Sequence, residues 1–271
     1  MGSRGTALIT GASSGLGEAY SHALARQGYD LVLVARRLDL LETLAGELKS
    51  RYGVGAEALA SDLASEVGMD RAVRRIEETD YLSILVNNAG CAVEGFFVDT
   101  DIGLQMNSVR LHDLATMRLT RAALPGMIAR GGGAVISVSS MGGFFPFPGN
   151  VVYNASKAFL VSFTQSLALE LWRTGVRVQV LCPGFTHTSF HATMEADVSQ
   201  IPEGMWMSAD EVVGESLRAL NKGRHGRIVF IPGRRNRRLG WLFLLPRPAV
   251  FRGSALLARV LEKKMGSARR D

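Results

Sequence analysis

A glycine-rich turn near the N-terminus restricts the folds open to this chain more than any other stretch. The segment TGASSGLG at 10–17 follows a short apolar run at 6–10 and precedes a helical repeat of apolar residues that begins at Leu16. In such a strand–turn–helix unit, glycines let the backbone approach a pyrophosphate at the helix N-terminus. The turn therefore predicts a dinucleotide-binding βαβ unit, although its G-x-x-x-G-x-G spacing differs from the general G-x-G-x-x-G fingerprint. The residues expected to contact the dinucleotide here are Gly11, Ser13, Ser14, Gly15, Leu16 and Gly17.

The alternation of strand and helix continues through most of the chain. Apolar runs predict further strands at 31–35, 56–60, 82–86, in the run AVISVSS that ends at Ser140, at 176–181 and at 227–231, with helices at 40–51, 101–130, 151–173 and 209–220. Repeated βα units of this length predict an α/β fold with a doubly wound parallel sheet and right-handed crossovers. The 271 residues are enough for one large domain with a full core. We assign 1–231 to this domain and 232–271 to a C-terminal extension.

Two arginines stand where the second strand is expected to end. An acidic residue at this position binds the ribose 2′-hydroxyl of NAD, whereas arginine accommodates the 2′-phosphate of NADP. Arg36 and Arg37 therefore favour NADP(H) over NAD(H), unless both are simply solvated surface charges. Asp39, just beyond them, is expected to cap the next helix.

Polar and small residues also follow the third and fourth strands. Asp62 is placed either to hydrogen-bond an adenine amino group or to cap the following helix. The fourth strand ends in the run NNAG at 87–90. Ligands of open parallel sheets bind outside the carboxyl ends of the strands. The further candidates for cofactor binding are therefore Asp62, Leu63, Asn88, Ala89 and Gly90.

A hydroxyl, a phenol and an ammonium are brought together between Val135 and Lys157. The strand in this stretch ends at Ser139 and Ser140, and a Gly- and Pro-broken loop leads to a helix that opens with Tyr153-Asn-Ala-Ser-Lys157. Tyr and Lys four residues apart project from one helix face, although this spacing also arises by chance in ordinary helices. An ammonium about 4 Å away stabilises a phenolate by roughly 4 kcal/mol at an effective dielectric of about 20. This attraction is expected to move the pKa of Tyr153 from about 10 towards neutrality, where acid–base catalysis is most efficient.

Composition and charge exclude several classes of protein. The two cysteines, Cys91 and Cys182, are too few for a disulfide framework and show no metal-ligand spacing, which indicates the reducing cytosol. The formal net charge of +6 is uneven: from Lys222 onward there are 14 Lys or Arg and 2 Asp or Glu, against 17 and 23 before it. A basic tail on an acidic body favours an anionic surface as partner of the tail, and not nucleic-acid binding by the whole domain.

Two segments leave alternatives open. The apolar run 241–245 is too short to span a bilayer, but with its flanking arginines it could rest on an anionic membrane face or pack in an oligomer interface. The segment 185–207, rich in Phe, His, Met and Trp, is either a mobile lid over an apolar substrate or a surface excursion packed on the core. His187 and His191 lie within it without an evident third ligand, so we expect no metal site.

Taken together, these motifs resemble the short-chain dehydrogenase/reductase family. TGASSGLG, the NNAG at 87–90, Ser140 with the Tyr-x-x-x-Lys motif thirteen residues on, and a Pro-Gly pair stand in the family's order and spacing over about residues 5–231. The resemblance implies a Rossmann-type sheet of seven parallel strands and a nicotinamide cofactor. It also implies a homodimer or homotetramer, built through the helices at about 101–130 and 151–173.

The resemblance further implies roles for individual residues. Tyr153 would be the general acid/base, Lys157 would lower its pKa and bind the nicotinamide ribose, and Ser140 would position the substrate oxygen. The cofactor would also contact Tyr153 and Lys157 themselves and the segment after the sixth strand, at Pro183, Gly184 and Thr186.

One departure from the family pattern concerns a proton relay. The family usually has an Asn about 27 or 28 residues before the catalytic Ser, where it supports a relay water near the Lys. Here that spacing falls on His112, whereas Asn107 lies about a turn earlier. We favour His112, because an imidazole can both donate and accept hydrogen bonds. The alternatives are an offset helix in which Asn107 serves, and a purely structural histidine.

The sequence therefore predicts an NADP-dependent oxidoreductase that interconverts an alcohol and a carbonyl, with Tyr153 moving the proton. Apolar residues at 142–149 and 185–207 favour a lipophilic small molecule as substrate. We expect the protein in the cytoplasm, with peripheral membrane contact through the extension as an alternative. Two other hypotheses are a nucleotide-binding scaffold or redox sensor with weak catalysis, and a peripheral membrane protein that acts through its basic tail.

Overall fold

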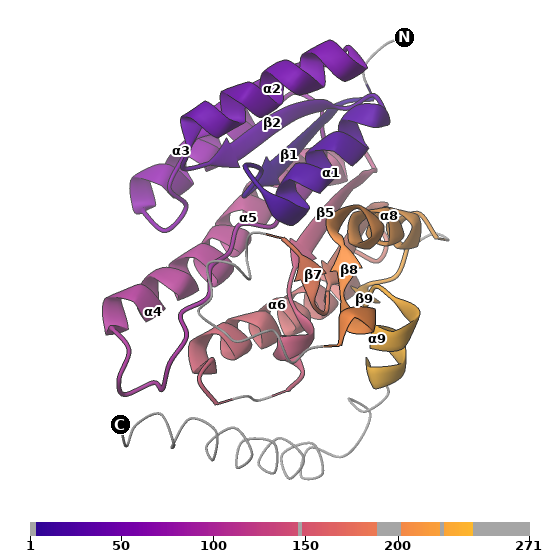
Figure 1. Ribbon diagram of the computed structural model, residues 1–271. Helices are drawn as coiled ribbons and strands as arrows, with labels where there is room; N and C mark the ends of the chain where they lie inside the picture. Colours follow the sequence, from indigo (N-terminus) through magenta and orange to yellow (C-terminus); the bar gives the residue numbers. More distant parts are fainter. Residues whose placement is uncertain (1–3, 146–147, 189–201, 223–224, 241–271) are drawn as a thin grey trace.

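A seven-stranded parallel sheet forms the centre of the structure (Figure 1). The computed structural model describes residues 4–145, 148–188, 202–222 and 225–240. The strand order is β3-β2-β1-β4-β5-β6-β9, so the chain crosses back over β1 on its way from β3 to β4. This order confirms the expected doubly wound Rossmann-type sheet. The strands are β1 (Thr6–Thr10), β2 (Asp30–Ala35), β3 (Ala56–Ala60), β4 (Leu82–Asn87), β5 (Gly133–Val138), β6 (Val176–Leu181) and β9 (Val229–Phe230).

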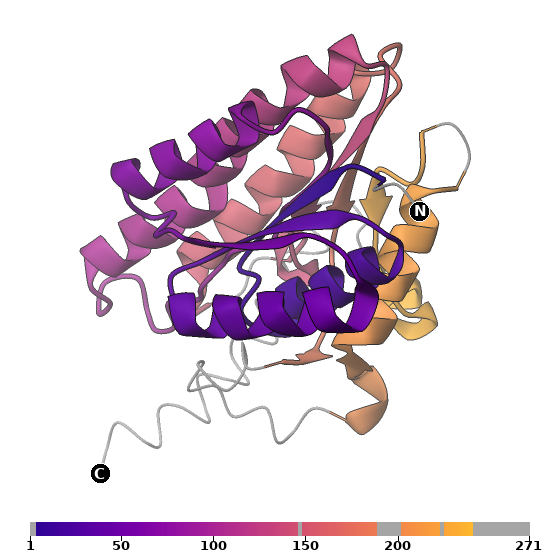
Figure 2. The ribbon, with the colours of Figure 1, turned by 90° about the horizontal axis from the view of Figure 1, so that it is seen from above.

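Helices cover both faces of the sheet (Figure 2). α1, α2 and α8 pack on one face, and α3, α5 and α6 pack on the other. Parallel strands require such two-sided cover, because every crossover between them has to pass over one face. The helices are α1 (Gly15–Arg26), α2 (Leu38–Tyr52), α3 (Glu66–Glu77), α4 (Ile102–Val109), α5 (Ala115–Ala129), α6 (Val151–Glu170), α8 (Ala209–Leu220) and α9 (Arg234–Gly240).

The alternation of side chains along each strand builds two hydrophobic cores. In β1, Ala7 and Ile9 belong to the core beneath α1, α2 and α8, whereas Leu8 belongs to the core beneath α3, α5 and α6. Because both faces are buried, the strands are nearly continuous apolar runs. The strands expected at 6–10, 56–60 and 176–181 accordingly have the bounds predicted from the sequence.

Other elements differ from the prediction. The single helix expected at 101–130 is divided into α4, a π-helical turn (Arg110–Leu114) and α5. Helix α2 begins at Leu38, which puts Asp39 inside its first turn and not at the cap. The strand expected at 227–231 is reduced to the two residues of β9. A second, two-stranded parallel sheet of β7 (Thr186–His187) and β8 (Met207–Ser208) was not expected.

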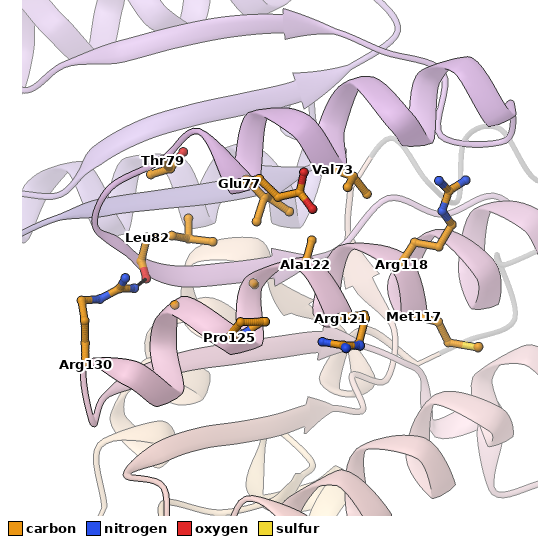
Figure 3. Close-up of a pocket in the computed structure, with 13 residues that line it drawn as sticks. Val73, Glu77, Thr79, Leu82, Met117, Arg118, Arg121, Ala122, Pro125 and Arg130 are labelled. Atoms are coloured by element: carbon orange, nitrogen blue, oxygen red, sulfur yellow. Dashed lines mark hydrogen bonds between the residues drawn. The ribbon is translucent and has the colours of Figure 1, made fainter.

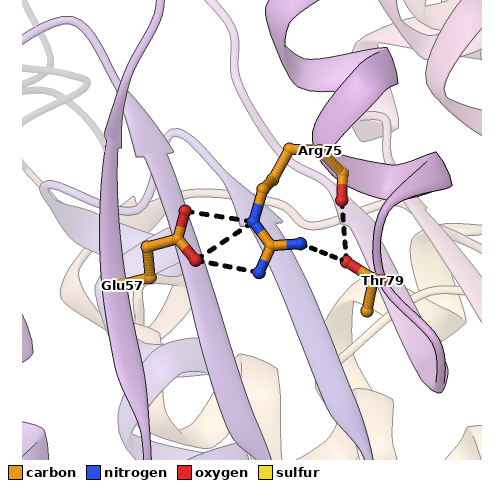
Figure 4. A network of polar contacts seen from close by, with 3 residues as sticks. All are labelled: Glu57, Arg75 and Thr79. Atoms are coloured by element: carbon orange, nitrogen blue, oxygen red, sulfur yellow. Dashed lines mark hydrogen bonds and ion pairs between the residues drawn. The ribbon is translucent and has the colours of Figure 1, made fainter.

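An ion pair joins α3 to the edge strand β3 (Figure 4). Arg75 Nε donates to both carboxylate oxygens of Glu57 at 3.0 Å, and its Nη1 donates to Thr79 Oγ1 at 2.8 Å. The hydrogen bonds to Glu57 raise the pKa of Arg75. Both side chains are partly exposed, so the pair contributes on the order of 1 kcal/mol or less.

A buried polar network holds α1 and α8 to β6. The hydroxyl groups of Tyr20 and Ser216 lie 2.6 Å apart, and Ser216 Oγ donates to Gln179 Oε1 at 2.6 Å. All three residues are fully buried. Since Ser216 has one hydroxyl hydrogen and gives it to Gln179, the Tyr20 hydroxyl is the donor to Ser216.

The C-terminal extension starts against the body of the protein. Arg237 of α9 donates to Glu215 of α8 at 2.8 Å, and Asn236 is buried. The domain boundary placed at 231 stays a prediction. The run 241–245 and the rest of 241–271, His191 and most of the predicted lid lie outside the described residues. Within the described ranges, no helix is long and apolar enough to cross a membrane, and no group of three His, Cys, Asp or Glu is placed to hold a metal ion.

We predict that Ser216→Ala lowers the free energy of unfolding by about 1–3 kcal/mol, because it leaves the Tyr20 hydroxyl and Gln179 Oε1 buried with no partner in this network. Urea denaturation followed by circular dichroism measures the change. Ser50→Ala, at an exposed position of α2, is the matched control and is expected to be neutral or slightly stabilising. Equal effects of the two substitutions would contradict the assignment of the network.

Candidate active site

The three residues expected to transfer the proton meet at the carboxyl end of β5. Ser140 follows β5 and begins a 3-10 turn, where its Oγ accepts a hydrogen bond from Gly142 N at 3.0 Å. The Tyr153 side chain is hydrogen-bonded to Ser140. Lys157, one helical turn further along α6, has its Nζ 5.4 Å from the centroid of the Tyr153 ring. The structure thus places a hydroxyl, a phenol and an ammonium side by side.

The pKa of Tyr153 differs from the expectation. Burial raises it to about 12, and the hydrogen bond with Ser140 offsets only part of this rise. The Lys157 ammonium lies over the face of the ring and donates to Val138 O at 3.0 Å. The expectation of a near-neutral pKa was wrong because it weighed the ammonium alone and left out the loss of hydration, which dominates here. Tyr153 is therefore protonated at neutral pH.

Lys157 is itself a buried charge, with 5% of its surface exposed. Burial lowers its pKa to about 8, and the carboxylate of Asp113 is the largest influence in the opposite direction. At neutral pH the ammonium form therefore predominates. With the ordinary lysine pKa of 10.5, a smaller fraction of Lys157 would be deprotonated at this pH.

The two serines at the end of β5 make different contacts. Ser139 is buried, and its Oγ donates to Lys157 O at 2.7 Å. Ser140 is partly exposed and lies beside Tyr153. Ser139 therefore attaches α6 to the sheet, whereas the hydroxyl of Ser140 faces the phenol.

The π-helical turn carries His112 into the site. His112 is 1% exposed, and its ring centroid lies 5.9 Å from that of Tyr153 in an edge-on arrangement. Its Nε2 accepts a hydrogen bond from Cys91 N at 3.1 Å, and its Nδ1 lies 3.3 Å from Ser108 Oγ. Burial, and then the charge of Lys157, lower the pKa of His112, so the ring is neutral. A neutral ring that accepts at Nε2 has its proton on Nδ1, which makes Nδ1 the donor to Ser108.

The two candidates for the relay position, Asn107 and His112, lie in different surroundings. Asn107 is exposed, and its Oδ1 accepts from Arg110. His112 lies at the site, but both of its ring nitrogens are engaged by Cys91 and Ser108. A relay through His112 would require one of these hydrogen bonds to open, and in this structure the ring supports the loop that follows β4.

The glycine-rich turn needs glycine at defined positions. Gly11 and Gly15 have φ values of +64° and +60°. A Cβ on Gly17 would come within 2.1 Å of Gly11 O, so no larger residue fits there without moving the turn. Ser14 is the N-cap residue of α1, yet its side chain makes no capping hydrogen bond. The amide groups at the start of α1 therefore have no partner from Ser14, an arrangement that suits an anion at the helix N-terminus.

One threonine ties this turn to β4. Thr10 Oγ1 accepts from the backbone N–H groups of Asn88 and Ala89, both at 2.9 Å. The Asn88 side chain in turn donates to Thr10 O at 2.9 Å and to Gly11 O at 3.3 Å. Asn88 therefore shapes the turn through its amide. Thr10 was missed from the sequence, where it looks like the last residue of a strand.

Of the two arginines after β2, Arg37 reaches the turn. Its Nη2 donates to Ser13 Oγ at 3.1 Å, and the side chains of both Arg36 and Arg37 are exposed. Arg37 and Ser13 thus present a guanidinium and a hydroxyl at the carboxyl ends of β1 and β2. Such a pair matches the charge and hydrogen-bonding needs of a phosphate.

The residues after β3 and β6 frame the same edge of the sheet. Asp62 is exposed and accepts from Ala64 N, and the cap of α3 is Ser65. The Leu63 side chain is buried in the core, which leaves only its backbone for a ligand. Gly90, after β4, is exposed at the same edge. After β6, the carbonyl of Pro183 accepts a hydrogen bond from Met141 N. Gly184 packs on Asn236, and the Thr186 hydroxyl donates to Gly184 O.

The described part of the predicted lid carries aromatic side chains on both sides of Thr186. The rings of Phe185 and Trp206 lie 5.5 Å apart, and the ring of His187 stacks on Trp206 at 4.8 Å. His187 also contacts Glu203 at 3.1 Å. The two ends of the predicted lid therefore pack on each other through aromatic contacts.

A groove of about 760 Å³ lies elsewhere, between α3 and α5 (Figure 3). Met117, Arg118 and Arg121 line it from α5, and Val73 and Glu77 line it from α3. None of its lining residues is among those predicted for catalysis or cofactor binding. The candidate active site at the carboxyl edge of the sheet is therefore separate from this groove.

The donor set at that edge fits a nicotinamide dinucleotide. The uncapped N-terminus of α1 would bind the pyrophosphate, and Ser13 and Arg37 would bind a 2′-phosphate. Lys157, beside Tyr153, would contact the nicotinamide ribose. A Cβ at position 17 would displace Gly11 O, so the backbone of the turn requires glycine there.

Comparison with known proteins agrees with this geometry. A family model for short chain dehydrogenases matches residues 5–200. A very-long-chain 3-oxoacyl-CoA reductase of Phaeosphaeria nodorum is 39% identical over 185 residues, which cover 66% of this chain and 54% of that protein. The chain thus spans about half the length of this curated relative.

Two solved structures share the fold over nearly their whole length. A short-chain dehydrogenase from Sphingobium yanoikuyae in complex with NADPH superimposes with a TM-score of 0.80 at 34% identity, covering 90% of this chain and 97% of that one. A bulky-bulky ketone specific alcohol dehydrogenase from Comamonas testosteroni superimposes with a TM-score of 0.76 at 30% identity, covering 91% and 96%.

We predict that Gly17→Ala abolishes NADPH binding while the protein still folds, because the added Cβ displaces Gly11 O and the Asn88 amide. Quenching of intrinsic fluorescence by NADPH measures the binding. Gly46→Ala is the matched control: it also lies within a helix, its Cβ would meet no atom within 4 Å, and it should leave binding unchanged and stabilise the protein by up to about 1 kcal/mol. Unchanged NADPH affinity in Gly17→Ala would show that the turn is not the cofactor site.

Proposed function

The chain belongs to the short-chain dehydrogenase family, and on that premise we propose that it is an NADP-dependent oxidoreductase that interconverts a carbonyl and an alcohol. The observation that carries the proposal is the grouping of Ser140, Tyr153 and Lys157 at the carboxyl end of β5. When bound, the nicotinamide supplies or accepts the hydride. The chain's own residues would then orient the substrate oxygen and move its proton.

Ser140 and Tyr153 are placed to act on the same oxygen. Their side chains are hydrogen-bonded to each other, so a substrate carbonyl oxygen that replaces this bond can accept from both hydroxyl groups. In the direction of reduction, hydride adds to the carbonyl carbon, and the Tyr153 hydroxyl gives its proton to the oxygen to complete the alcohol. The protonated state of Tyr153 at neutral pH suits this direction.

Lys157 would stabilise the charge left on Tyr153. As the proton leaves, negative charge develops on the phenol, and the ammonium stands 5.4 Å from the ring centroid. At that distance the attraction is roughly 3 kcal/mol for an effective dielectric of about 20. The ammonium therefore acts on the charged state of Tyr153 that forms during the reaction. It is not the dominant influence on the resting phenol.

NADP(H) is proposed as the cofactor in preference to NAD(H). Arg37 and Ser13 supply the hydrogen-bond donors for a 2′-phosphate, and the Sphingobium yanoikuyae structure contains NADPH. Asp62, which accepts from Ala64 N through Oδ1, is the candidate contact for the adenine amino group.

A lipophilic substrate is proposed from the apolar side chains near the site. Phe144 lies in the loop after Ser140, and the rings of Phe185 and Trp206 contact each other at the ends of the predicted lid. Two of the similar proteins act on a very-long-chain acyl-CoA and on bulky ketones according to their names. Both therefore handle large organic carbonyl compounds.

A homo-oligomer is proposed to form through α5 and α6. Large apolar side chains on these helices and on the π-helical turn before α5 are exposed: Leu114, Ile128, Val151 and Leu169. Contact with a second copy of the chain would remove them from water.

We predict that Tyr153→Phe lowers NADPH-dependent reduction by at least ~100-fold, because the proton donor is lost, while NADPH binding is retained. NADPH oxidation is followed across ketones and aldehydes of increasing chain length, and kcat/KM is expected to rise with length. Tyr81→Phe, an exposed tyrosine far from the site, is the matched control and should leave the rates unchanged. Undiminished turnover in Tyr153→Phe would contradict the mechanism, and rates independent of chain length would contradict the lipophilic substrate.

We also predict that Arg37→Gln weakens NADPH binding by about tenfold or more, because it removes a charged hydrogen bond to the 2′-phosphate, while NADH binding changes little. Isothermal titration with each cofactor gives the two affinities. Arg26→Gln changes the net charge equally at an exposed position in the last turn of α1 and should alter neither. Tighter binding of NADH than NADPH by the unmutated protein would overturn the proposed preference.

A further inference from the structure

A carboxyl group that the proposed mechanism does not use is hydrogen-bonded to the residue that precedes Lys157. Asp113 belongs to the π-helical turn, one residue after His112, and its Oδ2 accepts a hydrogen bond from Ser156 Oγ at 3.0 Å. Ser156 directly precedes Lys157 on α6, and both are buried, with 2% and 5% of their surfaces exposed. The turn and the helix thus bring a carboxylate and an ammonium into one buried region.

The second oxygen of Asp113 is enclosed by protein. Oδ1 is buried and makes no hydrogen bond to any described residue. A buried carboxylate oxygen is costly unless a positive charge compensates it. Burial raises the pKa of Asp113, and the hydrogen bond from Ser156 and then the attraction of Lys157 act in the opposite direction and favour its ionised form.

Burial favours the neutral form of three other groups that face Lys157. Tyr153 from its own helix and Cys182 from the end of β6 both have a pKa raised by burial to about 12, and burial keeps His112 neutral. Cys91 faces Lys157 from the loop after β4. Asp113 is the largest influence that opposes the burial of the ammonium, and it raises the pKa of Lys157.

We propose that Asp113 is a positioning residue of this site: its carboxylate, oriented by Ser156, is the counter-charge that keeps Lys157 in the ammonium form beneath the Tyr153 ring. The importance of this pair for catalysis rests on the proposed function, whereas the pairing itself does not. In the π-helical turn, His112 accepts a hydrogen bond from the loop after β4, and the next residue, Asp113, accepts one from α6. Two consecutive residues of one turn thereby contact two different elements of the site.

The pairing is tested by the pH dependence of folding stability. In the unmutated protein the folded-state pKa of Lys157, about 8, lies below its ordinary value of 10.5. The folded state therefore loses this proton first, and the contribution of Lys157 to stability increases as the pH rises above about 8. Asp113→Asn keeps an acceptor for Ser156 and removes only the charge. The pH at which the stability contribution of Lys157 begins to increase should therefore fall by on the order of one unit.

Urea unfolding from pH 6.5 to 9.5 measures this shift in the full chain. Lys157→Met is the reference that lacks the titration, and its curve is subtracted from the others. Asp113→Glu should restore the position of the increase, and Ser156→Ala should shift it in the same direction as Asp113→Asn but less. An increase over the same pH range in Asp113→Asn and in the unmutated protein would overturn the proposal.

A kinetic measurement separates this inference from the proposed function. The alkaline limb of kcat/KM for NADPH-dependent reduction should move to lower pH in Asp113→Asn by the same shift, and Asp113→Glu should move it back. A purely structural defect would lower the rate at every pH without moving the limb, and that result would also overturn the proposal. If no substrate is turned over by the unmutated protein, the proposed function fails, and the unfolding curves still decide whether Asp113 is paired with Lys157.

Discussion

The pairing of β1 with β4 is the constraint on which the site depends. The chain reaches β4 only after it has laid β2 and β3 on the other side of β1, so the carboxyl ends of β1 and β4 become neighbours at the point where the strand order reverses. At this point Thr10 accepts from two successive backbone amides after β4. The glycine-rich turn and the loop towards Cys91 are therefore held as one unit, and the two halves of a dinucleotide site share one edge.

The site combines this rigid edge with a charge that folding alone would not favour. Lys157 is almost completely buried, and the fall of its pKa from 10.5 to about 8 corresponds to roughly 3 kcal/mol against the ammonium form. Its ammonium donates to Val138 O, and Asp113 lies near it across the interface with α6. A buried cation of this kind is retained where its charge is needed. In the proposed reaction, the charge would stabilise the phenolate that Tyr153 becomes.

Much of this could be predicted from the sequence, and the reasons for success and failure are physical. Strands buried on both faces are apolar runs, and the Tyr-x-x-x-Lys spacing brings both side chains to one helix face, so β1, β6 and the pair Tyr153 and Lys157 could be located. The π-helical turn could not, because one extra residue in a turn leaves the apolar periodicity of the flanking helices nearly unchanged. The contacts of His112 and Asp113 depend on that turn. The pKa of Tyr153 was misjudged because hydration is lost to a whole environment that spacing does not reveal.

The division of labour between Ser139 and Ser140 shows how the structural and chemical parts of the site depend on each other. Successive residues at the end of a strand point to opposite sides, so the two hydroxyl groups cannot serve the same partner. Ser139 donates to Lys157 O, and Gly143 lies so close to this carbonyl that a Cβ would come within 2.8 Å of it. Helix α6 is therefore held against the strand end at the residue that carries the ammonium. With α6 attached at this carbonyl, the side chain of Tyr153, one turn earlier, is hydrogen-bonded to Ser140.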